Sequence, residues 1–495
     1  MGLGRKWCLA GFIGLLSGGA VSADDDYAQW RAQQKAEFSG YLSEQDQAFV
    51  GYLEGQWKSF KAYSGVVRDP APKPVKMPVA PDIAPDKAPP AQPVPAKPAP
   101  APDTPPKPVN KMPEVEPPAQ PRPLPPPTRP SVPSIQVSFY GVDVSLPQVD
   151  GLQQIPFGRR SSQSVADFWK AAAPLSVEPL LKAIQLRGQQ GGYNDWAIMQ
   201  LVRGYSIDVF PQSRDKQVLL QWFLLTRLGY RCKVGFSDDR MHLYLPTGQM
   251  VYEAQYLKID NQRYFIDLLT PGESVPNLTT YEGVYPGANK LLELRSDHTQ
   301  MDSGQWRARK LNFDFRGKPY AFTVHYDVNK IEFLASYPQT DFAFYFDSLP
   351  SQRTANELLE QLRPVVETLP QDEAVNFLLR FAQKAFDYKT DSEGFGFENY
   401  LLVEETLHYP YSDCEDRAVL FSWLARNLLD VPVIGLLYPG HVATAVLLDA
   451  PLPSARIAYG GQIYNVADPT YIGADAGMVM PQYENVAPTA IPVMQ

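Results

Sequence analysis

The sequence predicts an α+β protein. Two tandem domains are joined by antiparallel strands and preceded by an amphipathic helix and a Pro-rich disordered linker. Aromatic pairs recur at a fixed spacing near the N-terminus, the composition then shifts abruptly to proline, and one helix–strand pattern occurs twice in the remainder. A length of 495 residues favours two or three domains. The expected segments are, in chain order, 1–23, 24–64, 65–133, 134–275, 276–350 and 351–495.

Residues 1–23 have the pattern of a secretory signal peptide. Arg5 and Lys6 precede an apolar run, and Val21 and Ala23 occupy the −3 and −1 positions of a cleavage site. An uncleaved anchor helix is the alternative, although the run is short and glycine-rich for a membrane span. We therefore expect a secreted or periplasmic protein of the bacterial envelope, with no transmembrane segment after signal cleavage. The net charge of −9 gives no reason to expect a nucleic-acid partner.

Residues 24–64 are predicted to form one amphipathic helix. Four aromatic pairs follow one another at intervals of 11 residues: Tyr27/Trp30, Phe38/Tyr41, Phe49/Tyr52 and Phe60/Tyr63. Eleven residues make three helical turns, so all eight rings would lie on one face. Such a face needs cover, either by self-association through residues 27–63, as in a coiled coil, or by packing onto the same chain.

Residues 65–133 are predicted to be a Pro-rich disordered tether. Positions 70–133 contain 26 of the 49 prolines of the chain. A segment of this composition has few backbone donors and favours polyproline II over a packed fold.

The rest of the sequence suggests an internal duplication at a spacing of about 200 residues. "SRDKQVLLQWFLLTRLGYRCKVGF" resembles "CEDRAVLFSWLARNLLDVPVIGLL", and with Val218 aligned on Val419, Trp222 falls on Trp423 without a gap. "VSFYGVDVSLP" at 137–147 similarly resembles "TDFAFYFDSLP" at 340–350. The intervening stretch 276–350 alternates like antiparallel strands, with "RGKP" as a turn.

The second copy contains the residues that a thiol nucleophile requires. Ser412 and Asp413 are good N-cap residues, so Cys414 is expected in the first turn of a helix, where the helix dipole and free N–H groups favour a thiolate. His441 opens a strand after a Pro–Gly turn, and Asp468 ends a later strand. In this order His441 could take the thiol proton while Asp468 orients the imidazole.

The motifs "DCEDRA", "YPGHVATAV" and "YNVADPTY" resemble those of the transglutaminase-like superfamily, and in particular bacterial secreted transglutaminase-like proteins. The resemblance is strong over 352–475 and weak over 137–275. It implies a papain-like fold with Cys414 as nucleophile, His441 as base and Asp468 as orienting acid, and acyl transfer through a thioester. It also implies two oxyanion donors: the Cys414 backbone N–H and an upstream side chain, for which Asn399 and Tyr400 in "FGFENYL" are the candidates.

The first copy has lost the cysteine. The corresponding set is Ser213, His242 and Asp267, which we interpret as a degenerate site in a domain that packs against, gates or binds substrate for the second. Cys232 aligns with Val433 in a core strand and is expected to be buried. With so few cysteines, both Cys232 and Cys414 are expected to be free thiols.

These features predict a secreted enzyme that hydrolyses amide bonds in a protein or peptide substrate through a Cys414 thioester, as a cysteine protease or amidase does. Two alternatives remain open: a protein-cross-linking transglutaminase, and a non-catalytic envelope scaffold with vestigial domains. No CxxC or HExxH spacing occurs in the sequence, so we expect neither a metal nor another cofactor.

Overall fold

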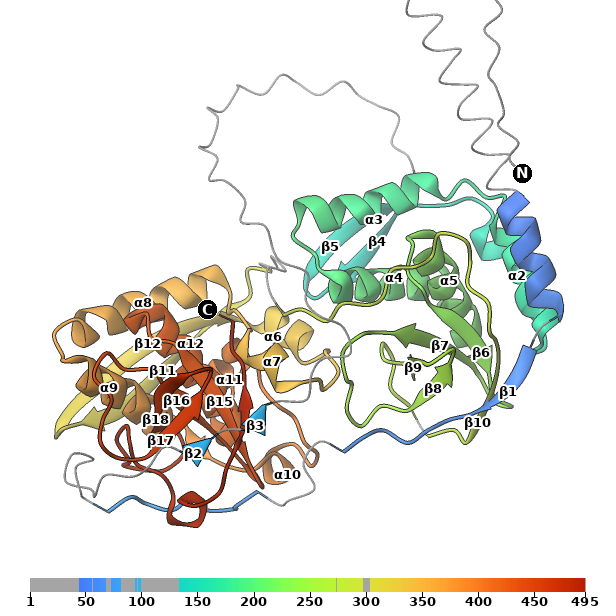
Figure 1. The fold of residues 1–495 in the computed structure, drawn as a ribbon. Coiled ribbons are helices and arrows are strands. Elements are labelled where there is room, and N and C mark those ends of the chain that lie inside the picture. The colour runs from blue at the N-terminus through green and yellow to red at the C-terminus, as the bar shows by residue number, and fades with distance from the viewer. Residues whose placement is uncertain are drawn as a thin grey trace, which may run out of the picture.

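Helices and strands are mixed in both lobes of the protein, as Figure 1 shows for a computed structural model of the chain. The structure describes residues 44–55, 57–67, 73–81, 94–95, 97–98, 133–272, 274–296 and 303–494. The α+β class is therefore confirmed. The predicted signal peptide and the first two aromatic pairs lie outside the described residues. Within them, no helix has both the length and the apolar character needed to cross a membrane.

The first lobe contains a six-stranded antiparallel sheet in the order β1-β10-β6-β7-β9-β8. Its strands are β1 (Trp57–Lys61), β6 (Lys233–Phe236), β7 (Met241–Pro246), β8 (Tyr256–Ile259), β9 (Gln262–Ile266) and β10 (Asn277–Tyr281). A hairpin and helices pack around it: β4 (Ser134–Phe139), β5 (Val142–Pro147), the 3₁₀ turn η2 (Leu152–Gln154), α2 (Ser162–Ala172), α3 (Glu178–Gln190), α4 (Asp195–Val209) and α5 (Arg214–Arg227).

The predicted helix over 24–64 is wrong at its C-terminal end. Residues 44–55 are helical, but 57–61 form β1 at the edge of the first sheet, so the last aromatic pair is not on a helix. Phe49 is 4% exposed and packs edge-on against Trp169 and Tyr285 of the first lobe. Packing onto the same chain thus covers this ring, because the aromatic core of the lobe offers it edge-to-face contacts.

The second lobe contains a seven-stranded sheet in the order β2-β17-β18-β16-β15-β19-β3. Its strands are β2 (Val94–Pro95), β3 (Lys97–Pro98), β15 (Val433–Tyr438), β16 (His441–Val446), β17 (Arg456–Tyr459), β18 (Gln462–Ala467) and β19 (Thr489–Ile491). The other elements are β11 (Trp306–Phe315), β12 (Lys318–Asp327), α6 (Val328–Leu334), α7 (Phe342–Phe346), α8 (Gln352–Val366), α9 (Gln371–Lys384), β13 (Asp387–Tyr388), α10 (Asp391–Gly394), α11 (Val403–His408), β14 (Tyr411–Ser412), α12 (Cys414–Leu429) and the 3₁₀ turn η3 (Pro481–Tyr483).

The two sheets share a strand order. The first reads β10-β6-β7-β9-β8 and the second β19-β15-β16-β18-β17, with every neighbouring pair antiparallel. A long helix, α5 or α12, precedes the second strand of each series. The sequence match at 137–147 and 340–350 has no such counterpart, since the first stretch is the β4–β5 hairpin and the second contains the short helix α7.

The expected antiparallel connection over 276–350 is only partly correct. β10 belongs to the first sheet, whereas β11 and β12 pair with each other and pack on α8 and α9. The turn between them is "RG", in which Arg316 (φ 51°) and Gly317 (φ 76°) both adopt left-handed backbone, as a two-residue hairpin turn requires. Residues 328–334 and 342–346 are helical rather than extended.

The Pro-rich stretch is not a free tether where it is described. β2 and β3 pair in parallel with β17 and β19, and the blue arrows lie beside the red second lobe in Figure 1. Residues 73–81 also lie on this lobe, where Ile472 N donates to Pro78 O at 3.2 Å and Ala80 N donates to Ile472 O at 2.8 Å. Proline removes donors, yet its carbonyls and the intervening N–H groups remain free to pair with an edge.

Candidate functional site

Cys414 is the first residue of α12, as predicted. Asp413 is the N-cap, with extended backbone at φ −110°, and its N–H donates to Asp416 Oδ2 at 3.1 Å. The side chain of Arg417, in the same turn, is fully buried and donates to Ser412 Oγ at 3.0 Å and Phe386 O at 2.8 Å. These bonds fix the start of the helix and therefore the position of the thiol.

The path of the chain brings His441 to the end of the lobe where α12 begins. After α12, a three-residue connection leads into β15, which packs against the helix and runs back along it. Gly440 then turns the chain at φ 70°, a conformation that favours glycine, and His441 opens β16. β18 pairs with β16 through Thr444 and Ala467, so Asp468 follows at the same end.

His441 and Asp468 form a buried pair. His441 Nε2 lies 2.8 Å from Asp468 Oδ2, and the other carboxylate oxygen accepts from Thr470 N at 2.9 Å and Thr470 Oγ1 at 2.8 Å. Burial acts to raise the pKa of Asp468, but the charge and hydrogen bond of His441 lower it below its usual value. When the ring is neutral and its Nε2–H donates to this carboxylate, Nδ1 is an acceptor. His441 Nδ1 is buried and has no hydrogen-bond partner among the described residues.

The Cys414 thiol has a different environment from the one predicted. It is 1% exposed and donates to Glu415 Oε2 at 3.0 Å rather than to His441. Burial raises the pKa of the thiol well above its usual value, and the charges of Glu415 and Asp413 raise it further. The helix dipole, equivalent to roughly half a charge, is outweighed by these adjacent carboxylates. In this arrangement burial and the two acidic neighbours therefore oppose the thiolate that the sequence predicts.

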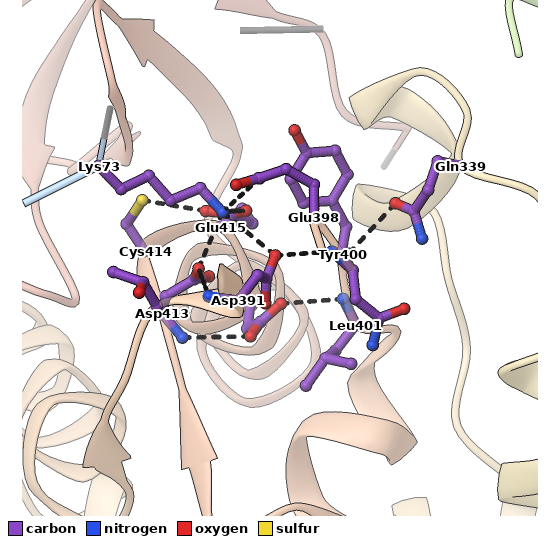
Figure 2. Close-up of polar contacts among 12 residues, drawn as sticks. Lys73, Gln339, Asp391, Glu398, Tyr400, Leu401, Asp413, Cys414 and Glu415 are labelled. Carbon is purple, nitrogen blue, oxygen red and sulfur yellow. Dashed lines mark hydrogen bonds and ion pairs between the residues drawn. The ribbon is translucent and has the colours of Figure 1, made fainter. Parts of the chain in front are cut away.

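A lysine from the Pro-rich stretch lies beside this thiol, as Figure 2 shows. Lys73 Nζ is 2.8 Å from Asp413 Oδ2, 2.8 Å from Glu398 Oε2 and 3.2 Å from Asp391 Oδ2, and it also contacts Glu415 Oε1. We call Asp391, Glu398, Asp413 and Glu415 the carboxylate pocket. The Lys73 side chain is only 11% exposed, and its ammonium lies 5.1 Å from the centre of the Tyr400 ring. The pocket therefore holds one buried cation.

The ionisable groups of the pocket have pKa values that are shifted in different directions. Burial alone would lower the pKa of Lys73, but the pocket carboxylates, Glu415 first, raise it well above its usual value, so the ammonium stays protonated. Burial likewise acts to raise the pKa of Glu415, yet Lys73 lowers it overall, whereas burial and the charges of Asp416 and Glu415 raise the pKa of Asp391 to about 9. Three overlapping groups of side chains, one of which includes Cys414, have possible metal-ligating atoms within 4.8 Å of one another. A metal ion could use this spacing, but the Lys73 ammonium contacts Asp391, Asp413 and Glu415 here.

The contacts of Asn399 and Tyr400, the two predicted oxyanion residues, are with groups other than the Cys414 thiol. Asn399 contributes its backbone N–H to Asp391 Oδ2 at 2.8 Å, and Tyr400 contributes its backbone N–H to Gln339 and its ring to Lys73. Tyr388 was missed. Its hydroxyl donates to Pro74 O at 2.9 Å, and it lies close enough to Cys414 and Asp413 that their charges add to burial in raising its pKa.

The first lobe keeps the histidine–aspartate pair but not the expected serine. His242 Nδ1 lies 2.7 Å from Asp267 Oδ2, while Ser213 is the N-cap of α5 and accepts from Lys216 N. Ser237 Oγ instead lies 3.0 Å from His242 Nε2. The pair thus uses the opposite ring nitrogen from the one that His441 uses.

The position of Cys232 agrees with its alignment to a core strand. It is 6% exposed, and burial raises the pKa of its thiol to about 12. Cys232 and Cys414 are both free thiols.

No protein-family model matches the chain, and neither the curated proteins nor the solved structures contain a match. The contacts above therefore carry the functional argument.

Lys73 and Tyr388 are the residues that sequence reasoning could not assign. Lys73 precedes its pocket partners by more than 300 residues, as its hydrogen bond to Asp391 (318 positions) shows. It sits among several similar Lys–Pro dipeptides, so no local pattern singles it out. Tyr388 belongs to no motif. The acidic run around Cys414 was visible in "SDCEDR", and it could have predicted a cation partner.

Proposed function

We propose that the protein is a secreted thiol acyl-transfer enzyme of the transglutaminase-like type, held here in a latent arrangement. The observation that carries the proposal is the buried His441–Asp468 pair, with Nδ1 unpartnered among the described residues, at the end of the lobe where Cys414 begins α12. Asp468 would fix the ring tautomer, and Nδ1 is then the nitrogen able to take the thiol proton. The shared strand order supports a duplication in which the second copy retained the chemistry.

In the proposed reaction Cys414 Sγ attacks the carbonyl carbon of an amide in a protein or peptide. The thiol proton passes to His441 Nδ1 and then to the leaving amine, and water hydrolyses the resulting thioester. Water is the proposed acceptor because the carboxylate pocket holds an amine as its protonated ammonium, which cannot attack a thioester. This favours hydrolysis over cross-linking.

A specific observation favours the second candidate, a non-catalytic envelope scaffold. The thiol is buried among carboxylates that raise its pKa, and its hydrogen bond goes to Glu415 rather than His441. In that case the second lobe is a binding domain, and the His441–Asp468 pair stabilises the sheet end only.

Acetylation of Cys414 by p-nitrophenyl acetate separates the two candidates. We expect a Lys73→Ala chain to form a Cys414 acetyl adduct faster than the latent wild-type chain, as detected by peptide mass mapping. We expect His441→Ala to slow the reaction at least 100-fold in either background. Cys232, buried in the other lobe, is the internal control thiol. If His441→Ala leaves the Cys414 acetylation rate unchanged in both backgrounds, the enzyme proposal fails and the scaffold remains.

Tyr388 is the side chain proposed to donate to the oxyanion. Replacing it with Phe is expected to lower the ratio of Cys414 acetylation to iodoacetamide alkylation by about 10- to 100-fold, because acyl transfer develops an oxyanion and alkylation does not. The ratio cancels any change in thiol access. Tyr464→Phe, on β18 with its ring against Tyr459, is the matched control. An unchanged ratio in Tyr388→Phe would remove Tyr388 from the mechanism.

A further inference from the structure

The stretch Lys73–Pro81, which we call the strap, lies on the second lobe like a bound peptide. Three kinds of contact hold it. The Lys73 ammonium lies in the carboxylate pocket, the Pro74 carbonyl accepts from the Tyr388 hydroxyl, and the main chain exchanges hydrogen bonds with the N–H and C=O groups of Ile472. Met77, between these contacts, is 5% exposed and packs in the main core, whereas Val75 and Val79 point outward at 65% and 70% exposure. The two inward side chains, Lys73 and Met77, are four positions apart with a bend at residues 75–76 between them, and main-chain hydrogen bonds to Ile472 follow. Side-chain anchors combined with main-chain hydrogen bonds are typical of a bound peptide.

We propose that the surface around Cys414 is a peptide-binding site that selects a lysine side chain, and that the strap is its tethered ligand. Four acidic side chains from three separate places in the chain converge on one ammonium, as Figure 2 shows, and the ring of Tyr400 lies against the same cation. Asp413, Glu415 and Asp391 are almost wholly buried, so the pocket would contain several uncompensated acids if it were empty. A ligand that brings a cation would compensate these acids, as the Lys73 ammonium does.

The contacts of Lys73 indicate which kind of side chain would carry the cation. The ammonium reaches all four carboxylates from a long unbranched stem, while the backbone stays far enough out for Pro74 O to meet Tyr388. The pocket recognises the protonated amine as a charge, because its carboxylates hold that proton rather than remove it. The expected ligand is thus a peptide with lysine at one position, a bend after it and a buried apolar residue four positions later, as in Lys73 and Met77.

Occupation by the strap would keep the site latent. Cys414 is 1% exposed with the strap in place, and the Pro74 carbonyl occupies the Tyr388 hydroxyl. A competing peptide with a lysine would displace the strap and supply the same positive charge. This inhibitory consequence rests on the proposed acyl-transfer function, whereas the binding of the peptide does not.

The test uses a fluorescein-labelled peptide of residues 70–81 and the full chain. Fluorescence anisotropy is expected to show at least tenfold tighter binding to Lys73→Ala than to wild type, since the variant's own strap has lost its ammonium. Lys76→Ala is the matched control: Lys76 lies in the same strap but is exposed, and this chain should bind as wild type does. A peptide with Ala in place of Lys73 should lose at least tenfold in affinity, and one with Ala in place of Lys76 should not.

Met77→Ala provides a second variant that leaves the pocket and Lys73 intact. It should also bind the free peptide more tightly than wild type, and circular dichroism checks that each variant is folded. Equal binding by all four chains, or equal binding of the two Ala-substituted peptides, would overturn the proposal. Anisotropy measures binding and requires no turnover, so the two proposals can fail separately. Peptide binding without Cys414 acetylation would contradict the enzyme proposal alone, and acetylation without peptide binding would contradict the peptide-binding proposal alone.

Discussion

Replacing Asp468 with Asn is expected to reduce Cys414 acetylation by about 10³- to 10⁴-fold. Asp468 Oδ2 accepts from His441 Nε2, which leaves Nδ1 as the basic nitrogen. An Asn side chain can present its NH₂ group to Nε2, and the ring proton would then move to Nδ1, which could no longer accept the proton of the thiol. The measurement is the rate of acetyl-adduct formation on Cys414 under saturating p-nitrophenyl acetate.

The first lobe supplies a matched control for this variant. Asp267 holds His242 at 2.7 Å in the same strand arrangement, so Asp267→Asn makes the same chemical change to a pair for which we propose no chemistry. It should leave Cys414 acetylation within about twofold of wild type. An equal loss in both variants would mean that the effect comes from destabilised sheets, and the assignment of Asp468 as the orienting acid would have to be abandoned.

The parts of the site that were predictable depend on local signals. A good N-cap before an apolar helix predicted where Cys414 begins α12, and the Pro–Gly turn predicted where His441 opens β16. Thr444 of β16 pairs with Ala467 of β18, so Asp468 follows opposite residue 443, two positions from His441 and on the same face of the sheet. Nearby residues largely determine helix starts, tight turns and strand pairing, so the sequence contains enough information to place these three side chains.

The remaining features depend on contacts that are distant in sequence. The 11-residue aromatic period is intact through Tyr63, yet Trp57–Lys61 pairs with β10, because an available sheet edge outweighs a weak helical preference. The buried carboxylates of Asp413 and Glu415 are paired with Lys73, which comes from a stretch whose composition indicates a tether. A Pro-rich composition limits internal folding, but it does not prevent docking on a partner surface that offers hydrogen bonds.

Replacing Glu405 with Gln is expected to stabilise the second lobe at pH 8.5 and to have little effect near pH 4.5. Glu405 is 3% exposed, and its carboxylate accepts a hydrogen bond from Leu402 N at 3.0 Å. Burial raises its pKa from 4.5 to about 8. The folded protein therefore keeps a proton that the unfolded chain releases, and the free energy of unfolding falls as pH rises from about 4.5 to about 8.

The size and shape of this effect distinguish it from a change in packing. The lost stability at high pH is on the order of 5 kcal/mol, from the pKa shift of one buried carboxyl group. The glutamine side chain of the variant keeps an oxygen for Leu402 N and replaces the protonated hydroxyl with an NH₂ group, so it resembles the low-pH form. Urea unfolding at both pH values measures the difference. Glu405→Ala removes the Leu402 bond and should destabilise the lobe at pH 4.5, where Glu405→Gln has little effect. If Glu405→Gln changes stability equally at pH 4.5 and 8.5, Glu405 does not titrate in this range. Its burial would then be compensated by a contact that lowers its pKa to the ordinary value.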